Sequence, residues 1–290
     1  MQMLLFTVIY FSRPQSGFGA AVLEKTIAPE GSDDNQYTDF SFENGYRIQR
    51  HSSVACRLVQ QNGKYVTDGS ESHCRAKAIA QAAQPHFNRL TVLIHGALRS
   101  SKRMEPIGIH LANHGIRSIG FDYASRRITV SEAAKSFREF CRGLPADEIH
   151  VVCHSMGGLV VREAIRQDRN LDKKITRHVF IGVPHSGSVL ADKYASRKWF
   201  QLLFGPAGQD LRTQSIASGL PKPSGRYINI YGGRGKRGFR FSEIEGDDDG
   251  VVSAKSAILD GAEATYRVKA IHSSLVKKQE SLNVISSFLR

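Results

Sequence analysis

The chain of 290 residues has little cysteine and no long apolar run. Its four cysteines include no Cys-x-x-Cys pair, and no group of histidines has the spacing of metal ligands, so a zinc site is disfavoured. No stretch reaches the roughly 18 consecutive apolar residues that a membrane-spanning helix needs, which excludes a polytopic membrane protein. The sequence also contains no internal repeat.

The cysteines that are present fit either a reducing or an oxidising compartment. Cys56 and Cys74 flank a predicted hairpin and could pair in an oxidising compartment, whereas Cys141 and Cys153 are expected to be buried thiols. The N-terminus favours export, because residues 3–11 are apolar and small residues follow at 19–21. We therefore expect a signal peptide over residues 1–21 and a secreted or periplasmic protein. No Lys or Arg precedes the apolar run, so a cytoplasmic location is the alternative.

The charge is strongly basic. The sequence has 40 Lys and Arg against 27 Asp and Glu, a net charge of +13, and basic proteins are attracted to anionic surfaces. Part of this excess lies in residues 232–240, GGRGKRGFR, for which a solvated loop is the simpler interpretation. If the segment has a function, an anionic membrane surface is the expected partner. Nucleic acid is not expected, because no nucleic-acid-binding motif accompanies the charge.

The order of predicted elements indicates an α/β fold. Apolar runs of strand length alternate with helix-like patterns over residues 88–290, which predicts a mostly parallel central sheet with helices on both faces. The predicted strands are residues 90–94, 116–121, 148–153, 176–182, 226–231 and 265–270, and the predicted helices are residues 102–113, 131–142, 157–168 and 276–289.

The region before this alternation has a different character. Residues 28–37 are polar and are interpreted as a linker, and residues 46–66 contain two β-rich stretches around Gln61-Asn62-Gly63, which predicts a hairpin. We expect these strands to be the antiparallel first strands of the main sheet. The predicted organisation is thus an N-terminal extension over residues 22–87, followed by a catalytic domain over residues 88–290.

The most informative stretch is residues 148–161, EIHVVCHSMGGLVV, where an apolar strand leads directly into Ser155 and a Gly-rich helix start. This is the form of a nucleophile elbow, a sharp strand-to-helix turn that exposes a serine hydroxyl and orients the next backbone N–H toward a developing oxyanion. Gly157 and Gly158 supply the trailing small residue of the usual Gly-x-Ser-x-Gly pattern. Cys153 occupies its leading position, which is a departure. An incidental serine in an ordinary strand-loop-helix is the competing interpretation.

The neighbouring segments favour the elbow. A predicted strand at residues 90–94 opens into His95-Gly96-Ala97, carboxylates cluster at residues 247–249, and His272 follows the predicted strand at 265–270. The chain order is thus Ser, Asp, His, the order in which an α/β-hydrolase presents its triad. A solvated turn would also explain the acidic cluster.

With these residues in view, the chain resembles an α/β-hydrolase of the bacterial lipase and esterase type. The resemblance covers about residues 88–290 and implies a serine hydrolase that cleaves carboxylic esters without a cofactor. The matching segments are LIHGA (93–97), CHSMGG (153–158), GVPHSGS (182–188), GDDDGVVS (246–253) and IHSSL (271–275).

The resemblance and the chemistry together assign the roles. Ser155 is the candidate nucleophile and His272 the candidate general base, because a serine hydroxyl is a poor nucleophile until its proton is removed. Asp249 is the preferred acidic partner, since Gly-x-x-Asp-x-x-Val is the arrangement of the family, and Asp248 is the reserve. The backbone N–H groups of Ala97 and Met156 are the expected oxyanion donors. His154 is expected to pack beside the elbow, and His95 and His185 to support loops through hydrogen bonds.

Residues 189–220 lie where such hydrolases often insert a cap, and their apolar density is high for a surface segment. One interpretation is an acyl-binding cap or lid in which Trp199, Phe200 and Phe204 contact the substrate. The other is an amphipathic helix packed on the domain.

Two other functions remain open at this stage. An acyltransferase or a thioesterase would use the same serine, aspartate and histidine with a different acyl acceptor or acyl donor. A non-catalytic binding module on a hydrolase scaffold is the alternative from a different class, since a fold does not fix a function.

Overall fold

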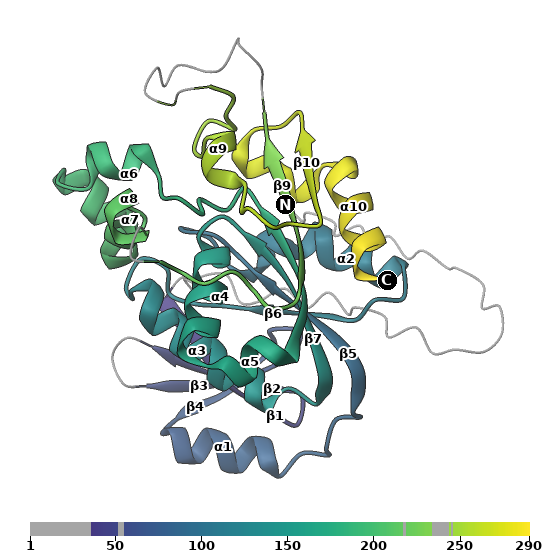
Figure 1. The fold of residues 1–290 in the computed structure, drawn as a ribbon. Coiled ribbons are helices and arrows are strands. Elements are labelled where there is room, and N and C mark those ends of the chain that lie inside the picture. Colours follow the sequence, from purple (N-terminus) through teal and green to yellow (C-terminus); the bar gives the residue numbers. More distant parts are fainter. Residues whose placement is uncertain (1–35, 52–54, 217–218, 234–243, 245) are drawn as a thin grey trace, which may run out of the picture.

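The computed structural model describes residues 36–51, 55–216, 219–233, 244 and 246–290 (Figure 1). The predicted signal peptide, most of the predicted linker and the basic residues 234–240 lie outside these ranges. None of the described helices is long and apolar enough to cross a membrane.

A six-stranded parallel sheet forms the centre of the larger unit, with the strand order β10-β9-β8-β7-β5-β6 (Figure 1). All six strands were predicted from their apolar runs, and the fold class is confirmed. The strands are β5 (Phe87–Ile94), β6 (Ser118–Phe121), β7 (Ala146–His154), β8 (Ile175–Ile181), β9 (Arg226–Gly232) and β10 (Ala264–Val268).

Helices cover both faces of this sheet, and each face has its own apolar core. Side chains of α3 (Val130–Gly143) and α4 (Met156–Gln167) fill one core, and those of α2 (Glu105–Asn113) and α10 (Gln279–Leu289) fill the other. Sheets with parallel strands are normally buried in this way, because the crossover helices lie on their faces. The smaller helical elements are η2 (Ser101–Met104), α5 (Arg169–Lys174), α9 (Ala254–Ala257) and η3 (His272–Lys277).

The predicted cap region forms a helical excursion at one end of the molecule (Figure 1). It consists of α6 (Val189–Tyr194), α7 (Lys198–Asp210) and α8 (Thr213–Ile216). Gly205 has a left-handed φ of 59° and kinks α7 just before Pro206, where the chain passes close to the carbonyl of Arg126. The excursion is therefore anchored to the loop that follows β6.

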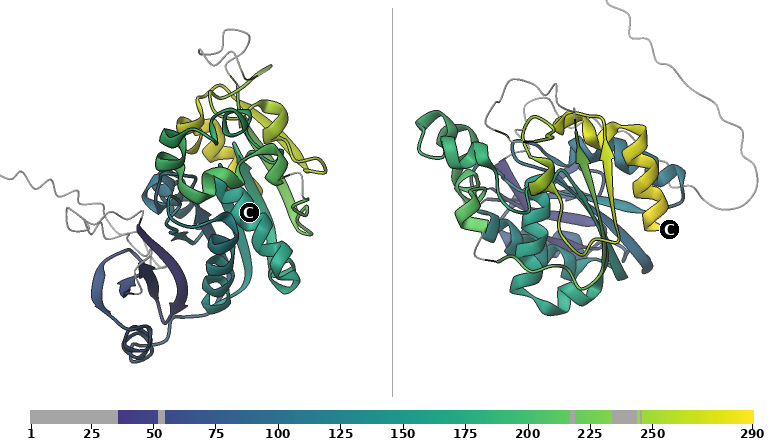
Figure 2. Two further views of the ribbon diagram at one scale, coloured as in Figure 1. Left: turned by 90° about the vertical axis from the view of Figure 1, so that its left-hand side faces the viewer. Right: turned by 45° about the horizontal axis from the view of Figure 1, so that its top comes forward.

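The N-terminal strands do not join the main sheet, so that part of the prediction was wrong. They form a separate antiparallel sheet in the order β1-β2-β3-β4, seen as a small purple layer beside the larger unit in Figure 2. A hairpin signal specifies that two strands pair with each other, but it does not specify the sheet to which they belong. The elements of this part are β1 (Tyr37–Glu43), β2 (Tyr46–His51), β3 (Cys56–Gln60), β4 (Tyr65–Gly69) and α1 (Glu71–Ile79).

This smaller sheet has its own apolar core beneath α1, which includes Ile48, Leu58, Cys56 and Cys74. The two cysteines are free thiols, so the suggested disulfide is absent and apolar packing fills these positions instead. Cys141 and Cys153 are buried free thiols, as predicted.

Candidate active site

Ser155 stands between the last residue of β7 and the first residue of α4, in a backbone conformation that is rare for a residue with a side chain. Its φ is 54° and its ψ is −129°. Such conformations cost free energy and persist only where the surroundings impose them. Here the Ser155 N–H donates a 2.9 Å hydrogen bond to the carbonyl of Ile181 at the end of β8. The segment has the geometry of a nucleophile elbow.

Glycines surround this turn because there is no room for a β-carbon. A β-carbon on Gly96 would lie 2.8 Å from Cβ of Ser155, and one on Gly157 would lie 2.6 Å from the carbonyl oxygen of His95. One on Gly158 would lie 2.5 Å from a methyl group of Val183. The small residues predicted for this turn are therefore a steric requirement of the elbow.

Cys153, which replaces the usual leading glycine, is fully buried in the core between the sheet and α4. Burial raises the pKa of its thiol well above the ordinary value, so the group stays protonated. The cysteine therefore has a packing role, and Ser155 is the residue that the turn presents.

His272 and Asp249 are paired. Nδ1 of His272 lies 2.7 Å from Oδ2 of Asp249, and the His272 N–H donates to the Asp249 carbonyl at 2.8 Å. The other carboxylate oxygen of Asp249 accepts the N–H groups of Val251 and Val252. The carboxylate of Asp248 instead accepts the N–H of Gly250. The geometry thus favours Asp249 over Asp248 as the partner of His272, in agreement with the preference drawn from the sequence pattern.

The turn that carries His272 is held by His154 and Arg103. Nε2 of His154 donates to the His272 carbonyl at 3.1 Å, and the two rings lie 4.7 Å apart. Burial lowers the pKa of His154 well below its ordinary value, so the ring is neutral. Arg103 of η2 donates to the carbonyl of Ser273. His154 therefore contacts the turn that carries His272, and it is the residue immediately before Ser155 in the chain.

The His272 side chain is 13% exposed, so its ring remains accessible from solvent. Within the described residues the Ser155 hydroxyl makes no hydrogen bond to another protein group. Long catalytic hydrogen bonds are common where no substrate is bound. Gly182 passes beside the pair, and a β-carbon there would lie 3.2 Å from both Asp249 and His272.

The two expected oxyanion donors flank Ser155. Ala97 follows Gly96, which is packed against the serine side chain, and Met156 is the first residue of α4. The first N–H groups of a helix have no partner within it and attract negative charge. Across the described part of the chain, neither N–H donates to a protein acceptor. Both groups are thus available to a bound oxyanion.

His95 supports the loop that carries Ala97. Nδ1 of His95 is 2.8 Å from the Gly96 carbonyl, the Tyr123 N–H donates to Nε2, and the two rings stack at 4.3 Å. Burial lowers the pKa of His95, which keeps its ring neutral. The supporting role predicted for this histidine agrees with its contacts.

His185 also supports a loop. The buried guanidinium of Arg162 on α4 contacts Nδ1 and the carbonyl of His185, and it donates to the carbonyls of Leu220 and Pro221. Burial lowers the pKa of Arg162 to about 10. Arg162 thereby fastens the loop after β8, and the segment that follows the cap, to the helix that begins after Ser155.

The aromatic residues predicted to bind substrate lie on α7. Phe200 and Phe204 stack at 4.5 Å, and Phe200 is buried in the main core. The side chain of Trp199 lies outside the described part of the structure. A cavity of about 570 Å³ opens between the loop after β8 and α8, lined by His185, Ser186, Thr213, Gln214 and Ile216. Contact of the aromatic residues with a substrate stays a prediction.

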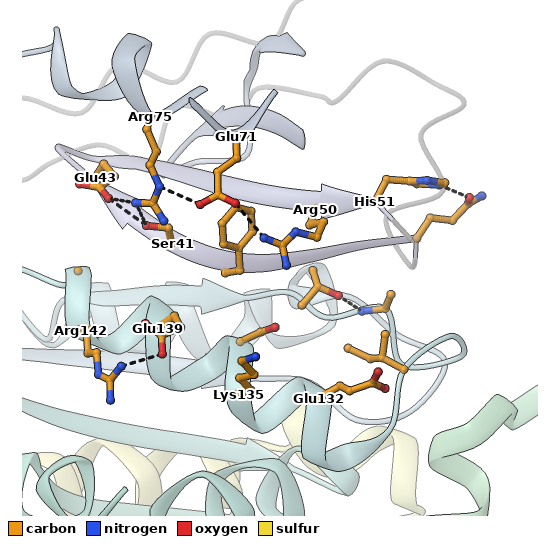
Figure 3. A pocket seen from close by; sticks show the side chains of 17 residues that line it. Ser41, Glu43, Arg50, His51, Glu71, Arg75, Glu132, Lys135, Glu139 and Arg142 are labelled. Atoms are coloured by element: carbon orange, nitrogen blue, oxygen red, sulfur yellow. Dashed lines mark hydrogen bonds and ion pairs between the residues drawn. The ribbon is translucent and has the colours of Figure 1, made fainter. Parts of the chain in front are cut away.

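A larger cavity of about 740 Å³ is lined by residues of the N-terminal sheet, α1 and α3 (Figure 3). Several of its charged side chains pair with one another: Arg75 lies between Glu43 and Glu71, Arg50 also binds Glu71, and Arg142 binds Glu139. None of the candidate catalytic residues lines it. The chemistry of Ser155 is therefore separate from this cavity.

No group of three or more His, Cys, Asp or Glu side chains that could hold a metal ion exists among the described residues.

Two features of the site could not be inferred from the sequence: the contact of Arg103 and the hydrogen bonds that Asp249 accepts from two backbone N–H groups. No local signal could have identified Arg103, since its partner lies 170 residues away. Gly182, by contrast, is the first residue of GVPHSGS (182–188), one of the segments on which the resemblance rests.

Comparisons with known proteins agree with this architecture. Residues 58–212 match the family model described as a domain of unknown function, DUF7379. That region includes Ala97 and Ser155 but ends before Asp249 and His272. A search of curated protein sequences found no match.

Solved structures with this fold include lipases and esterases. The mature form of the Bacillus licheniformis lipase BlEst2 has a TM-score of 0.57 and 22% identity over 69% of this chain and 91% of its own. The metagenomic carboxyl esterase MGS0156 has a TM-score of 0.51 and 16% identity over 72% of this chain and 73% of its own. The lin2722 gene product of Listeria innocua has a TM-score of 0.50 and 17% identity over 70% and 94%, respectively. The chain therefore has the α/β-hydrolase fold of lipases and esterases.

Proposed function

Since the chain belongs to the DUF7379 family and has the α/β-hydrolase fold, we propose that it is a serine hydrolase of carboxylic esters. The observation that carries the proposal is the pairing of His272 with Asp249 close to a serine in the elbow conformation. Ser155 follows β7, Asp249 lies between β9 and β10, and His272 follows β10, so all three come after the carboxyl ends of parallel strands, where such folds carry their chemistry.

The reaction begins with Ser155. Its oxygen attacks the ester carbonyl while Nε2 of His272 accepts the hydroxyl proton, and the carbonyl π electrons move onto the oxygen to give a tetrahedral intermediate. The carboxylate of Asp249, held by two backbone N–H groups, keeps the proton on Nδ1 of His272 and leaves Nε2 free to act as base.

The oxyanion of this intermediate is bound by the N–H groups of Ala97 and Met156. When it collapses, the bond to the alcohol oxygen breaks, and His272 returns its proton to that oxygen. Water then attacks the acyl-enzyme by the same route and releases the acid. Loss of one oxyanion donor typically slows such a reaction by about 100-fold to 1,000-fold.

The similar structures include a lipase and a carboxyl esterase, which supports an ester or a lipid as the substrate. The net charge of +13 supports action near an anionic membrane surface. The apolar residues 3–11, with small residues at 19–21, support an exported protein. The apolar residues of α7, Trp199, Phe200 and Phe204, are proposed to form the acyl side of the site.

The test is hydrolysis of p-nitrophenyl esters from acetyl to palmitoyl by the purified protein. Ser155→Ala should lower kcat/KM by at least about 10,000-fold, as expected for loss of a nucleophile, with an unchanged melting temperature. Ser131→Ala, a serine of α3, is the matched control and should retain full activity. Activity in Ser155→Ala equal to that of the wild type would remove Ser155 from the mechanism.

Added alcohols and thioesters extend the same experiment. Transfer of the acyl group to an alcohol in preference to water would identify an acyltransferase, and preference for thioesters would identify a thioesterase. A folded protein that neither hydrolyses any ester nor reacts with a serine-directed phosphonate would be a binding module, and the proposal would be wrong.

A further inference from the structure

The N-terminal sheet is joined to the segment that follows β6. The Asp39 N–H donates to the Asp122 carbonyl at 2.9 Å, and the Asp122 N–H donates to a carboxylate oxygen of Asp39 at 2.7 Å. Two residues further along, the Ala124 N–H donates to the hydroxyl of Thr38 at 2.9 Å. β1 therefore fixes the backbone of residues 122–124.

Arg47 lies at the centre of this junction. Its Nη1 is 3.1 Å from Oδ2 of Asp39 and 3.0 Å from Oδ2 of Asp122, and all three residues are buried. Two buried carboxylates so close together would repel each other without a cation between them. Burial raises the pKa of Asp39 to about 6. Burial also opposes ionisation of Asp122, but Arg47, His95 and the hydrogen bonds from Ser101 together outweigh it, and the pKa of Asp122 falls below its ordinary value.

Asp122 in turn holds the loop at residues 95–101. Its Oδ1 accepts the Ser101 N–H at 2.6 Å, and its Oδ2 accepts the Ser101 hydroxyl at 2.7 Å. Oδ1 also lies 3.8 Å from Nε2 of His95. The end of the loop is thus fastened to the same carboxylate that Arg47 contacts.

The rest of the loop is held by Tyr123 and Ser125. The Tyr123 hydroxyl donates to the His95 carbonyl at 2.9 Å, and the Leu98 N–H donates to the Ser125 hydroxyl at 3.0 Å. Leu98 has a left-handed φ of 59°, which needs such support. Ala97 lies between these anchors, so its N–H has the orientation that residues 122–125 impose on the loop.

We propose that Arg47, a residue of the N-terminal sheet, is a positioning residue for the oxyanion loop at residues 95–101, acting through Asp122. This inference rests on the proposed function, because it assigns the oxyanion-donor role to Ala97. It adds that the rate of ester hydrolysis depends on the N-terminal sheet, which is separate from the parallel sheet of the hydrolase fold.

Arg47→Met is the first test. Without the guanidinium, Asp122 loses its ionic partner, and we expect its carboxylate to hold Ser101 less firmly. Because a displacement of about 1 Å near reacting groups can cost about 100-fold, we expect kcat for a p-nitrophenyl ester to fall by that order, with KM within about 2-fold. Arg47→Lys, which retains the charge, should recover part of the loss.

Arg75→Met is the matched control. Arg75 is an arginine of α1 in the same N-terminal region, and its ion pairs are with Glu43 and Glu71 (Figure 3). Its loss removes the same charge and should leave kcat within about 2-fold of the wild type, as surface ion pairs contribute little.

Hydrogen–deuterium exchange supplies a readout that does not require activity. Arg47→Met should increase exchange in peptides that cover residues 95–101 and leave residues 156–167 of α4 unchanged. This result would support the coupling even if no ester is hydrolysed, in which case only the proposed function would fail. Wild-type kcat together with wild-type exchange at residues 95–101 in a folded Arg47→Met protein would overturn the inference.

If Arg47→Met does not fold, Asp122→Asn replaces it, since the amide oxygen still accepts from Ser101 while the charge is lost. A folded Asp122→Asn protein with reduced kcat and faster exchange at residues 95–101 supports the positioning role. An equal rise in exchange across the whole chain, or the same kcat loss in Arg75→Met, would show general destabilisation instead and would also overturn it.

Discussion

Asp249 binds His272 through one carboxylate oxygen and binds two backbone N–H groups through the other. Oδ2 lies 2.7 Å from Nδ1 of His272, while Oδ1 accepts from Val251 and Val252 at 3.0 and 2.8 Å. The carboxylate is only 2% exposed, so it cannot rotate into solvent. It therefore fixes both the tautomer and the orientation of the histidine ring.

Exchanging this carboxylate for an amide tests that role. In Asp249→Asn the amide can present an N–H to Nδ1, which favours the wrong tautomer of His272, and we expect kcat to fall by about 10,000-fold. Asp248→Asn is the control, because its carboxylate accepts from the Gly250 N–H instead. Steady-state kinetics on one ester measures both. A larger loss in Asp248→Asn than in Asp249→Asn would transfer the role to Asp248.

Gly96→Ala tests the contact between the oxyanion loop and the elbow. The added methyl group would lie 2.8 Å from Cβ of Ser155, so one of the two segments must move. We expect destabilisation of about 1–3 kcal/mol from overpacking and a fall in kcat of about 100-fold. Urea unfolding and ester hydrolysis measure the two effects.

Gly108→Ala is the control for this substitution. Gly108 lies inside α2, where the nearest atom to an added methyl group would be 3.5 Å away. The change should stabilise the helix by about 0.5–1 kcal/mol without altering kcat. Full activity in Gly96→Ala would mean that the loop and the elbow tolerate separation.

Phe42→Ala tests whether the N-terminal sheet is an integral part of the protein. Phe42 is a residue of β1, yet its ring packs edge-on against Phe140 of α3, 5.9 Å between centroids, within the main core. Its removal should cost about 3–5 kcal/mol of unfolding free energy. Tyr65→Ala, on the exposed side of β4, should cost less than about 1 kcal/mol. Equal effects of the two would show that β1 packs only loosely on α3.

Acid should destabilise the fold through His150 and His178. Both rings are buried, and burial lowers each pKa from 6.5 to about 4. Between these values the unfolded chain binds protons that the folded chain does not, so stability is full above pH 6.5 and falls as the pH drops toward 4. The slope is about 1.4 kcal/mol per pH unit for each histidine.

His178→Leu isolates this effect. Asp39 acts in the opposite direction, because its pKa is raised to about 6 in the folded protein, and stability from this group increases as the pH falls below that value. The difference between the variant and the wild type cancels such contributions. Unfolding free energies in urea at pH 7, 6 and 5 should decline less steeply in His178→Leu. Parallel curves would show that the His178 ring takes up its proton without unfolding.

The strands and helices of the hydrolase unit could be predicted because each is encoded by a local pattern. The elbow could be predicted for a steric reason, since Gly157 and Gly158 leave room that other residues would fill. The choice of Asp249 over Asp248 depended on the resemblance to a family, and the structure pairs that carboxylate with His272. Whether these residues act as assigned stays a prediction.

The long-range pairings could not be predicted. Arg47 and Asp122 are separated by 75 residues, and the ionic attraction that joins them leaves no periodic signal in either segment. The same holds for β1, whose residues resemble any short edge strand until α3 is in place beside them. Local composition specifies which elements form, whereas the partners of buried charges follow from the way these elements pack.

The bond between Arg103 and the Ser273 carbonyl has a consequence for how the protein is made. During synthesis the N-terminal sheet, the oxyanion loop and the elbow emerge from the ribosome well before His272, and domains begin to fold from the N-terminus. The nascent chain can therefore assemble the core beside α3 and α4 first. The second core closes only when residues 272–289 have emerged, because Leu275, Ile285 and Leu289 pack there against α2, and the turn that carries His272 then docks against Arg103.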